Sequence, residues 1–372
     1  MIGGETIRAD VVGSLLRPPE LLDARRRYAA GEIPAPEFKR IEDRAVDWAI
    51  SLQERAGLRV VTDGEMRRES FQSQLVEAVE GFSGHTIDAW LWGDWHGDEA
   101  VGDKNTDRPP ELGVVGKLRR RRHLCVEEFV YARARTDRTV KVTLPSPSMY
   151  ANLWSPELSK EAYPTLDGFL EDVAEILREE VDELVRLGAE YIQLDAPHYP
   201  LLLDPKTRGF YEERGWPFGR WMSRGVELDN RVIGDHPGVT FAFHLCRGNQ
   251  GSRWLVSGSY EPLAEALFAN VNAHRLMLEY DDERSGTFEP LLHVPEDKTA
   301  VLGLVTTKSG RSETPEELEA RIREASRYVP LERLALSPQC GFATSIVGNS
   351  LSVEDEERKL GAIVRTAENV WG

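Results

Sequence analysis

The stretch VTFAFHLC, residues 239–246, is an apolar run that ends in a histidine and a cysteine. Seven further short runs rich in β-branched or apolar residues occur along the chain. In order, the eight are IRADVVGS (7–14), RVVTDGE (59–65), TVKVTLPSP (139–147), YIQLDAP (191–197), VTFAFHLC (239–246), RLMLEYD (275–281), TAVLGLVTT (299–307) and RLALSPQCG (333–341). Longer stretches with helical spacing separate them, which is typical of strands and helices around a parallel sheet. Eight such units predict an α/β fold, a (β/α)8 TIM barrel.

Helical spacing is clearest in four stretches. Residues 36–57 and 165–188 carry apolar side chains at intervals of three and four residues, and each stretch ends at a glycine. Pro315 predicts the first turn of a third helix, with Thr314 as its N-cap. Residues 352–370 are rich in charged residues around a few apolar ones and predict a last helix that closes the ring.

Residues suited to chemistry gather where the predicted strands end. A TIM barrel carries out its chemistry at the C-terminal rim of its strands. A doubly wound sheet, the alternative, would not bring all eight strand ends to one place. The residues at or just past these ends are Ser14, Glu65, Pro147, Asp195, Cys246, Glu279, Thr307 and Cys340.

The length of 372 residues suits a single TIM-barrel domain, residues 1–372, with insertions at about 83–136 and 198–237. Residues 83–112 are acidic and rich in tryptophan, and residues 113–136 alternate basic and apolar positions like a β-hairpin. Loops of this length usually serve as lids or binding loops. We therefore expect the insertions to cover the rim, or to form the interface of a homo-oligomer.

Composition and charge narrow the class of protein. The chain has 41% apolar and 29% charged residues and a net charge of −17, which argues against a nucleic-acid or anionic-membrane surface. The basic run Arg119–Arg122 is a local exception that we interpret as a solvated strand or hairpin. Three cysteines without paired spacing argue against a disulfide framework and favour a reducing cytoplasm. No export or membrane-anchoring segment is expected.

His244, Cys246, Glu279 and Cys340 together predict a zinc site. In an extended strand, His244 and Cys246 point to the same face because one residue separates them. Imidazole, thiolate and carboxylate are the donors that Zn²⁺ takes. The alternative is that the cysteines are small buried hydrophobes, which is the interpretation we give to Cys125.

Seven segments then resemble the cobalamin-independent methionine synthase superfamily, in particular single-barrel members that correspond to the catalytic C-terminal half of the two-barrel enzyme. The segments are VVGSLLRP (11–18), VTDGEMRRESF (61–71), YIQLDAP (191–197), FHLCRGN (243–249), LMLEYDD (276–282), GLVTTKSGRSETPEEL (303–318) and LALSPQCGFAT (334–344). The similarity is weakest in 83–135 and 198–237.

The resemblance implies a TIM barrel that binds one zinc ion through His244, Cys246, Glu279 and Cys340. Because a carboxylate binds zinc less strongly than a thiolate does, we expect Glu279 to be the ligand that a substrate thiol displaces or loosens. It implies attack of that thiol on an alkyl donor, with homocysteine as the thiol in methionine synthases.

The same resemblance implies a set of substrate-binding residues. Gly13 and Ser14 correspond to positions near the carboxylate of homocysteine, and Glu65 and Asp195 to positions near its ammonium group. Trp154 matches a tryptophan beside the pterin of the methyl donor. Buried carboxylates need a cationic partner, so an amino thiol would suit Glu65 and Asp195 in this chain.

The chain departs from the family at one segment. Two-barrel members carry a D-x-H-S-P-R segment whose histidine is the proposed proton donor, and this chain has Lys308 there, within TTKSGR (306–311). A lysine with an ordinary pKa near ~10.4 is a poor acid at neutral pH. We expect Lys308 to be a catalytic residue that either carries a proton or balances charge on the donor.

The sequence therefore favours a zinc-dependent thiol S-alkyltransferase, with methyl transfer to homocysteine from methyltetrahydrofolate or a methylcorrinoid donor, including a corrinoid protein. One alternative is addition of a thiolate to an epoxide, as in epoxyalkane:coenzyme M transferases. A sulfonate-bearing thiol would call for arginines. Two others are a metal-free decarboxylase with the same barrel and a zinc-holding or homocysteine-sensing protein without turnover.

Overall fold

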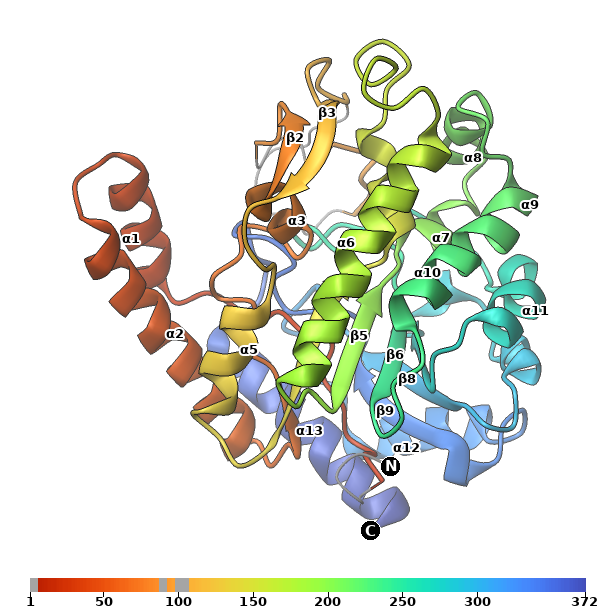
Figure 1. Cartoon of the computed structure of the whole chain (residues 1–372). Coiled ribbons are helices and arrows are strands. Elements are labelled where there is room, and N and C mark those ends of the chain that lie inside the picture. Colours follow the sequence, from red (N-terminus) through yellow and green to blue (C-terminus); the bar gives the residue numbers. More distant parts are fainter. Residues whose placement is uncertain (1–5, 87–91, 98–106) are drawn as a thin grey trace.

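A parallel sheet of seven strands forms the centre of the protein (Figure 1). The structure is a computed structural model, and it describes residues 6–86, 92–97 and 107–372. The strand order is β1-β4-β5-β6-β7-β8-β9, and every neighbouring pair is parallel. Their bounds are β1 Val60–Val61, β4 Thr139–Pro145, β5 Tyr191–Asp195, β6 Thr240–Leu245, β7 Arg275–Glu279, β8 Thr299–Val305 and β9 Leu334–Pro338. These strands confirm the α/β class and seven of the eight predicted runs.

The first predicted run, residues 7–14, does not form a strand. It pairs with β9 through a single parallel bridge between Ala9 and Leu336, and its chain then bonds to the turn after β1 through Leu15 N and Gly64 O, 3.0 Å apart. The Asp10 carboxylate accepts a hydrogen bond from the next backbone N–H, that of Val11, at 2.8 Å. This local bond competes with a strand ladder, so the sheet has seven strands rather than the predicted eight.

Two layers of side chains fill the interior of the curled sheet. An apolar layer consists of Ile7, Val12, Val60, Tyr191, Ala242, Met277, Val301 and Ala335. The second layer is ionic: Lys141 Nζ lies 2.9 Å from Asp10 Oδ1, and Arg275 lies 3.2 Å from Asp10 Oδ2. Tyr191 donates to the same carboxylate at 2.6 Å. Burial of charge is tolerated here because each group has a partner.

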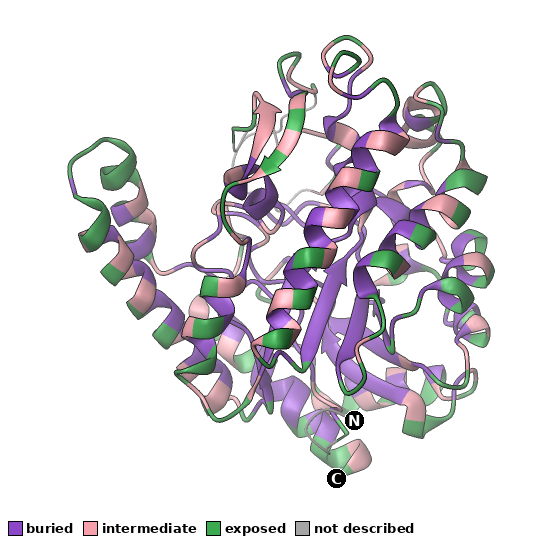
Figure 2. Cartoon of the chain, viewed as in Figure 1, coloured by how far each residue is buried: buried purple, intermediate pink, exposed green. Residues whose placement is uncertain are grey.

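Helices cover the outside of the sheet, with buried faces inward and exposed faces outward (Figure 2). Their bounds are α1 Pro19–Ala29, α2 Ala35–Arg55, α3 Ser73–Ala78, α5 Val126–Arg133, α6 Leu166–Arg186, α7 His198–Leu201, α8 Pro205–Glu212, α9 Phe218–Arg220, α10 Val226–Ile233, α11 Glu261–Asn270, α12 Pro315–Ala325 and α13 Val353–Trp371. The predicted N-cap Thr314 forms a capping box with Glu317. No helix in the described ranges is long and apolar enough to span a membrane.

The predicted hairpin at 113–136 is only half correct. Strand β3, Gly113–Arg120, pairs antiparallel with β2, Val79–Ser83, and the rest of the segment contains helix α5. The Glu180 carboxylate of α6 accepts from the backbone N–H groups of Cys125 and Val126, at 2.7 and 3.1 Å. A partner for the free N–H groups at a helix start favours the helix. The contact with Glu180 therefore overrides the alternation of basic and apolar residues in this segment.

The basic run Arg119–Arg122 lies on a solvated face and has acidic partners. Arg119 pairs with Glu80, and Arg120 with Glu179.

The insertion at 83–112 is described only outside residues 87–91 and 98–106, and the tryptophan at position 90 lies outside the described residues. The insertion at 198–237 is mostly helical, with α7 to α10 and the π-helical turn η2, Trp221–Gly225.

Candidate metal centre and substrate cavity

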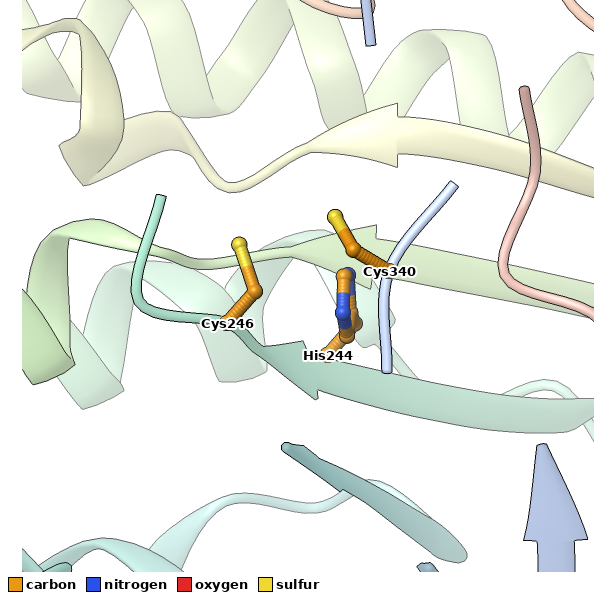
Figure 3. A group of neighbouring side chains, drawn as sticks. All are labelled: His244, Cys246 and Cys340. Atoms are coloured by element: carbon orange, nitrogen blue, oxygen red, sulfur yellow. The ribbon is translucent and has the colours of Figure 1, made fainter. Parts of the chain in front are cut away.

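His244, Cys246 and Cys340 meet at the C-terminal end of the sheet (Figure 3). Strand β6 carries His244 at its end and Cys246 just beyond, whereas Cys340 follows β9. The ligand atoms of the three residues lie within 4.8 Å of one another, and all three residues are buried. Zinc bonds of about 2.0–2.3 Å to nitrogen and sulfur suit such a group. Two sulfurs and one imidazole nitrogen form a donor set that zinc prefers.

The two sulfurs interact with each other directly. The hydrogen bond from Cys340 lowers the pKa of Cys246, and the same bond raises the pKa of Cys340 well above its usual range. Cys246 is therefore the more acidic of the two thiols. A thiolate is the form that ligates metal, and metal binding releases the proton of the second thiol. The pair thus has the chemistry that a thiophilic cation requires.

Asp195 fixes the orientation of the His244 ring. Its Oδ1 lies 2.8 Å from His244 Nδ1 and also accepts from Gln193 Nε2 at 2.7 Å. Burial lowers the pKa of His244, but the bond to Asp195 and the nearby Cys246 raise it to about 8. A carboxylate on Nδ1 leaves Nε2 to face a metal, the usual arrangement around histidine ligands.

Glu279, the fourth predicted ligand, is outside this group of three. Its Oε1 lies 3.2 Å from both Lys308 Nζ and Arg284, and its Oε2 accepts from the backbone N–H of Arg247 at 2.7 Å. Although burial raises the pKa of Glu279, these cations lower it to about 2. The carboxylate is therefore ionised and held by positive charge, and its field reaches both cysteines.

Lys308 is a buried counter-ion in this structure. Its Nζ lies 3.2 Å from Glu279 and 3.6 Å from Asp281. Burial lowers the pKa of Lys308, but these two carboxylates raise it above its usual value. Lys308 is also not among the residues that line the cavity described next. In this geometry the positive charge of Lys308 balances the negative charges of Glu279 and Asp281.

A cavity of about 310 Å³ lies above the three metal-binding candidates. His244, Cys246 and Cys340 belong to its lining, together with Ser14, Glu65 and Asp195. Both predicted insertions supply part of the wall. Their contributions are Trp92, Gly93, Asp94, Trp95 and His96 from the first, and His198, Leu201, Asp204, Lys206, Thr207, Phe210 and Tyr211 from the second.

Glu65 offers a free acceptor to this cavity. Its Oε1 accepts from Thr143 at 2.7 Å and lies 3.5 Å from Arg68, whereas its Oε2 is buried without a hydrogen-bond partner. The backbone of Glu65 is left-handed, with φ of 55°, which is uncommon outside glycine. A Cβ at Gly13 would lie 2.7 Å from Glu65 Oε1. Gly13 thus makes room for the Glu65 side chain.

Ser14 and Trp154 are placed differently. Ser14 borders the cavity and packs against Gly341, where an added Cβ would lie 2.0 Å from Ser14 Oγ. Trp154 is part of the apolar core, and its Nε1 donates to the carbonyl of Tyr163 at 3.0 Å. It is not among the cavity-lining residues, unlike Met149 in the preceding 3-10 helix.

Sequence reasoning missed several residues of the site. Arg247 and Arg284 hold Glu279, and Gln193 holds Asp195. His198 lines the cavity directly after β5. Its position three residues beyond Asp195, in QLDAPHYP, was the available signal, because residues that follow a barrel strand lie at the active rim.

The comparisons with known proteins agree with this geometry. The model of the family described as "Cobalamin-independent synthase, Catalytic domain" matches residues 7–368. The chain belongs to this family. The resemblance to the cobalamin-independent methionine synthases is thereby confirmed.

Relatives within the cobalamin-independent synthases match most of the chain. The uncharacterized protein YxjG of Bacillus subtilis is 36% identical over 98% of this chain and 94% of its own length. A methionine synthase of Pyrococcus abyssi is 27% identical over 89% of this chain and 85% of its own length. The solved structure of a candidate vitamin-B12-independent methionine synthase from Listeria monocytogenes has a TM-score of 0.73, with 27% identity, and covers 99% of this chain and all of its own.

Proposed function

We propose that the protein is a zinc-dependent S-methyltransferase that methylates a small amino thiol of the homocysteine type. The observation that carries the proposal is the convergence of His244, Cys246 and Cys340 on the floor of a cavity that also contains Glu65 and Asp195. Membership in the cobalamin-independent synthases, and the methionine synthase names of several relatives, support this class of reaction.

His244, Cys246 and Cys340 would hold the ion, and Glu279 on the neighbouring strand end is the fourth, exchangeable ligand of the proposal. Zn²⁺ at this position would lower the pKa of a thiol that joins it and so supply a nucleophile at neutral pH. Asp195 holds the Nδ1 side of the His244 ring and so leaves Nε2 for the ion. Lys308 and Arg284 balance the charge of Glu279 and hold its carboxylate in place.

Glu65 would bind the ammonium group of the thiol substrate. Its unpartnered Oε2 is buried beside the cavity, and an N–H donor from the substrate would satisfy it. Burial raises the pKa of Glu65, and a substrate cation would offset that effect. Ser14 offers a hydroxyl in the same lining, suited to a substrate carboxylate.

The cavity lining does not support addition of a sulfonate-bearing thiol to an epoxide. Among the described residues that line it are two buried carboxylates, Glu65 and Asp195, and no arginine. A sulfonate would require positive charge in place of these acids. The two insertions, with Trp92 and Phe210 among their cavity residues, leave the upper part of the cavity for the methyl donor, for which methyltetrahydrofolate is the leading candidate.

The test is an anaerobic assay of methionine formation from homocysteine, with methyltetrahydrofolate or methylcobalamin as donor and with zinc measured in each sample. We expect Cys246→Ala and Cys340→Ala to lose bound zinc and activity while they keep the fold, because rim residues contribute less to the core. Cys125→Ser is the matched control, since Cys125 lies beside Arg68, outside the metal group.

Two results would count against the proposal. One is stoichiometric zinc in Cys340→Ala, which would remove this cysteine from the metal site. The other is a zinc-loaded wild-type protein that forms no methionine with either donor. Tight homocysteine binding in that second case would favour a sensor over an enzyme.

A further inference from the structure

A chain of hydrogen bonds runs from the cavity wall into the helical layer, away from the metal residues. His198, the first residue of α7, has Nε2 2.8 Å from Ser148 Oγ. Ser148 Oγ lies 3.2 Å from Ser146 Oγ, which donates to Asp229 Oδ1 at 2.5 Å. All four side chains are buried, and they come from four separate positions along the chain. Such a row of hydroxyl, imidazole and carboxyl groups can carry a proton along its length.

The cavity end of this chain has an unused nitrogen. His198 lines the cavity, and its Nδ1 is buried and makes no hydrogen bond. The ring packs against Trp221, with ring centres 5.2 Å apart. A buried polar atom without a partner is destabilising and rare in native proteins. A polar atom of a bound ligand would give His198 Nδ1 the partner that it lacks.

The inner end of the chain can store a proton near neutral pH. Burial raises the pKa of Asp229 to about 7, while Ser146 and Tyr199 stabilise its ionised form. The Tyr199 hydroxyl donates to Asp229 Oδ2 at 2.6 Å. Burial also lowers the pKa of His198 to about 3, so its imidazole is neutral. A neutral imidazole accepts on one nitrogen and donates from the other, which lets His198 pass a proton on.

We propose that His198 is a catalytic residue that protonates the leaving group of the methyl donor, and that Ser148, Ser146 and Asp229 are positioning residues that supply its proton. This inference rests on the proposed function. As the sulfur–carbon bond forms and the carbon–nitrogen bond of the donor breaks, the leaving nitrogen takes the proton of His198 Nδ1. Nε2 then takes the proton of Ser148, Ser148 that of Ser146, and Ser146 that of Asp229.

The protons balance over one turnover. The thiol loses one proton when it becomes the nucleophile, and the leaving group gains one, so that RSH and CH₃–X give RSCH₃ and HX. Between turnovers His198 Nδ1 takes up a proton from the cavity, and the same hydrogen bonds return one proton from Nε2 to Asp229. Before transfer the protonated Asp229 donates to Ser146, and after transfer Ser146 donates to the ionised Asp229, which is the direction in the structure. Every hydrogen bond between His198 and Asp229 is kept, and only its direction is reversed. The relay therefore needs no rearrangement of the buried side chains.

The relay also specifies the chemical class of the donor. A nitrogen leaving group without a proton would depart as an amide anion, which is a strong base, so N-methyl donors require an acid. General acid catalysis typically contributes 10²–10⁴-fold. A methylcorrinoid releases a cobalt-centred leaving group that needs no proton. A comparison of the rates with the two donors therefore distinguishes a role of His198 in proton transfer from a purely structural role.

The experiment compares His198→Gln, Ser148→Ala and Ser148→Thr with the wild type, using homocysteine and either methyltetrahydrofolate or methylcobalamin. With the folate donor, we expect His198→Gln and Ser148→Ala to be roughly 10²-fold slower or more. With methylcobalamin, we expect less than about threefold change, since no acid is required. Ser148→Thr keeps the hydroxyl and should restore most of the rate. His236→Gln, a histidine beside Asp182 on the surface, is the matched control.

The outcomes distinguish this inference from the proposed function. Equal losses with both donors, or no loss with the folate donor, would overturn the relay and leave the thiol methyltransferase intact. A wild-type enzyme that accepts only methylcobalamin would overturn it as well. A wild-type protein inactive with both donors would overturn the proposed function and the relay together. Zinc content and the circular dichroism spectrum verify that each variant is folded.

Discussion

Glu356 gives the protein a stability that depends on pH in a defined direction. This residue of α13 is fully buried, and its Oε1 accepts from the backbone N–H of Leu16 at 3.0 Å, while its Oε2 has no partner. Burial raises the pKa of Glu356 from its ordinary 4.5 to about 8. At about 1.4 kcal/mol for each pKa unit, this corresponds to roughly 5 kcal/mol as an upper value.

The sign follows from which state holds the proton. Between pH ~4.5 and ~8 the folded protein keeps Glu356 protonated while the unfolded chain does not. The free energy of unfolding therefore falls as the pH rises through this window. Glu356→Gln is neutral at every pH and keeps the acceptor for Leu16. At pH 5 the free energy of unfolding of this variant should be close to that of the wild type. At pH 8.5 it should be several kcal/mol higher than that of the wild type.

Urea unfolding followed by tryptophan fluorescence at pH 5.0, 7.0 and 8.5 measures this difference. Glu357→Gln is the matched control, because Glu357 is the next residue of the same helix but is only partly buried and pairs with Arg55 at 3.3 Å. Exposed pairs contribute little to stability, so this control should follow the wild type. Parallel curves for Glu356→Gln and wild type across the three pH values would refute the reasoning.

Two further changes test the metal site and the cavity. Asp195→Asn should weaken zinc binding by roughly 10–100-fold, because the carboxylate orients the His244 ring; competition with a chromophoric chelator measures it, and unchanged affinity would contradict the role. Gly341→Ala places a Cβ 2.0 Å from Ser14 Oγ and should raise the KM for the thiol, whereas Gly209→Ala in α8, with nothing within 4 Å, should leave KM unchanged.

Much of the architecture was predictable because apolar runs and helical spacing are local signals. Seven of the eight predicted runs are strands, and the N-cap at Thr314 was identified correctly. The first run failed because the Asp10 carboxylate bonds to its own backbone and to Lys141, a partner 131 residues away. The hairpin at 113–136 failed for a similar reason, since Glu180 on a distant helix caps α5.

The candidate site was predictable in its residue types and less so in its contacts. His244, Cys246 and Cys340 follow from strand ends alone, because a parallel sheet brings these ends to one edge. The surroundings of Glu279 depend on Arg284, in a short 3-10 helix, and on Lys308, in the segment after β8. The spacing of residues along the chain does not predict such long-range contacts between side chains.

The ionic layer below the cavity has a kinetic consequence. Asp10, Lys141 and Arg275 are paired and buried in the interior of the curled sheet, so their side chains occupy the route through it. Trp92 and Phe210 line the cavity on the side of the two insertions. In the proposed reaction both substrates would share this one cavity, so the small thiol would bind before the bulkier donor. The spent donor would then leave before the methylated thiol, which gives an ordered sequence of binding and release.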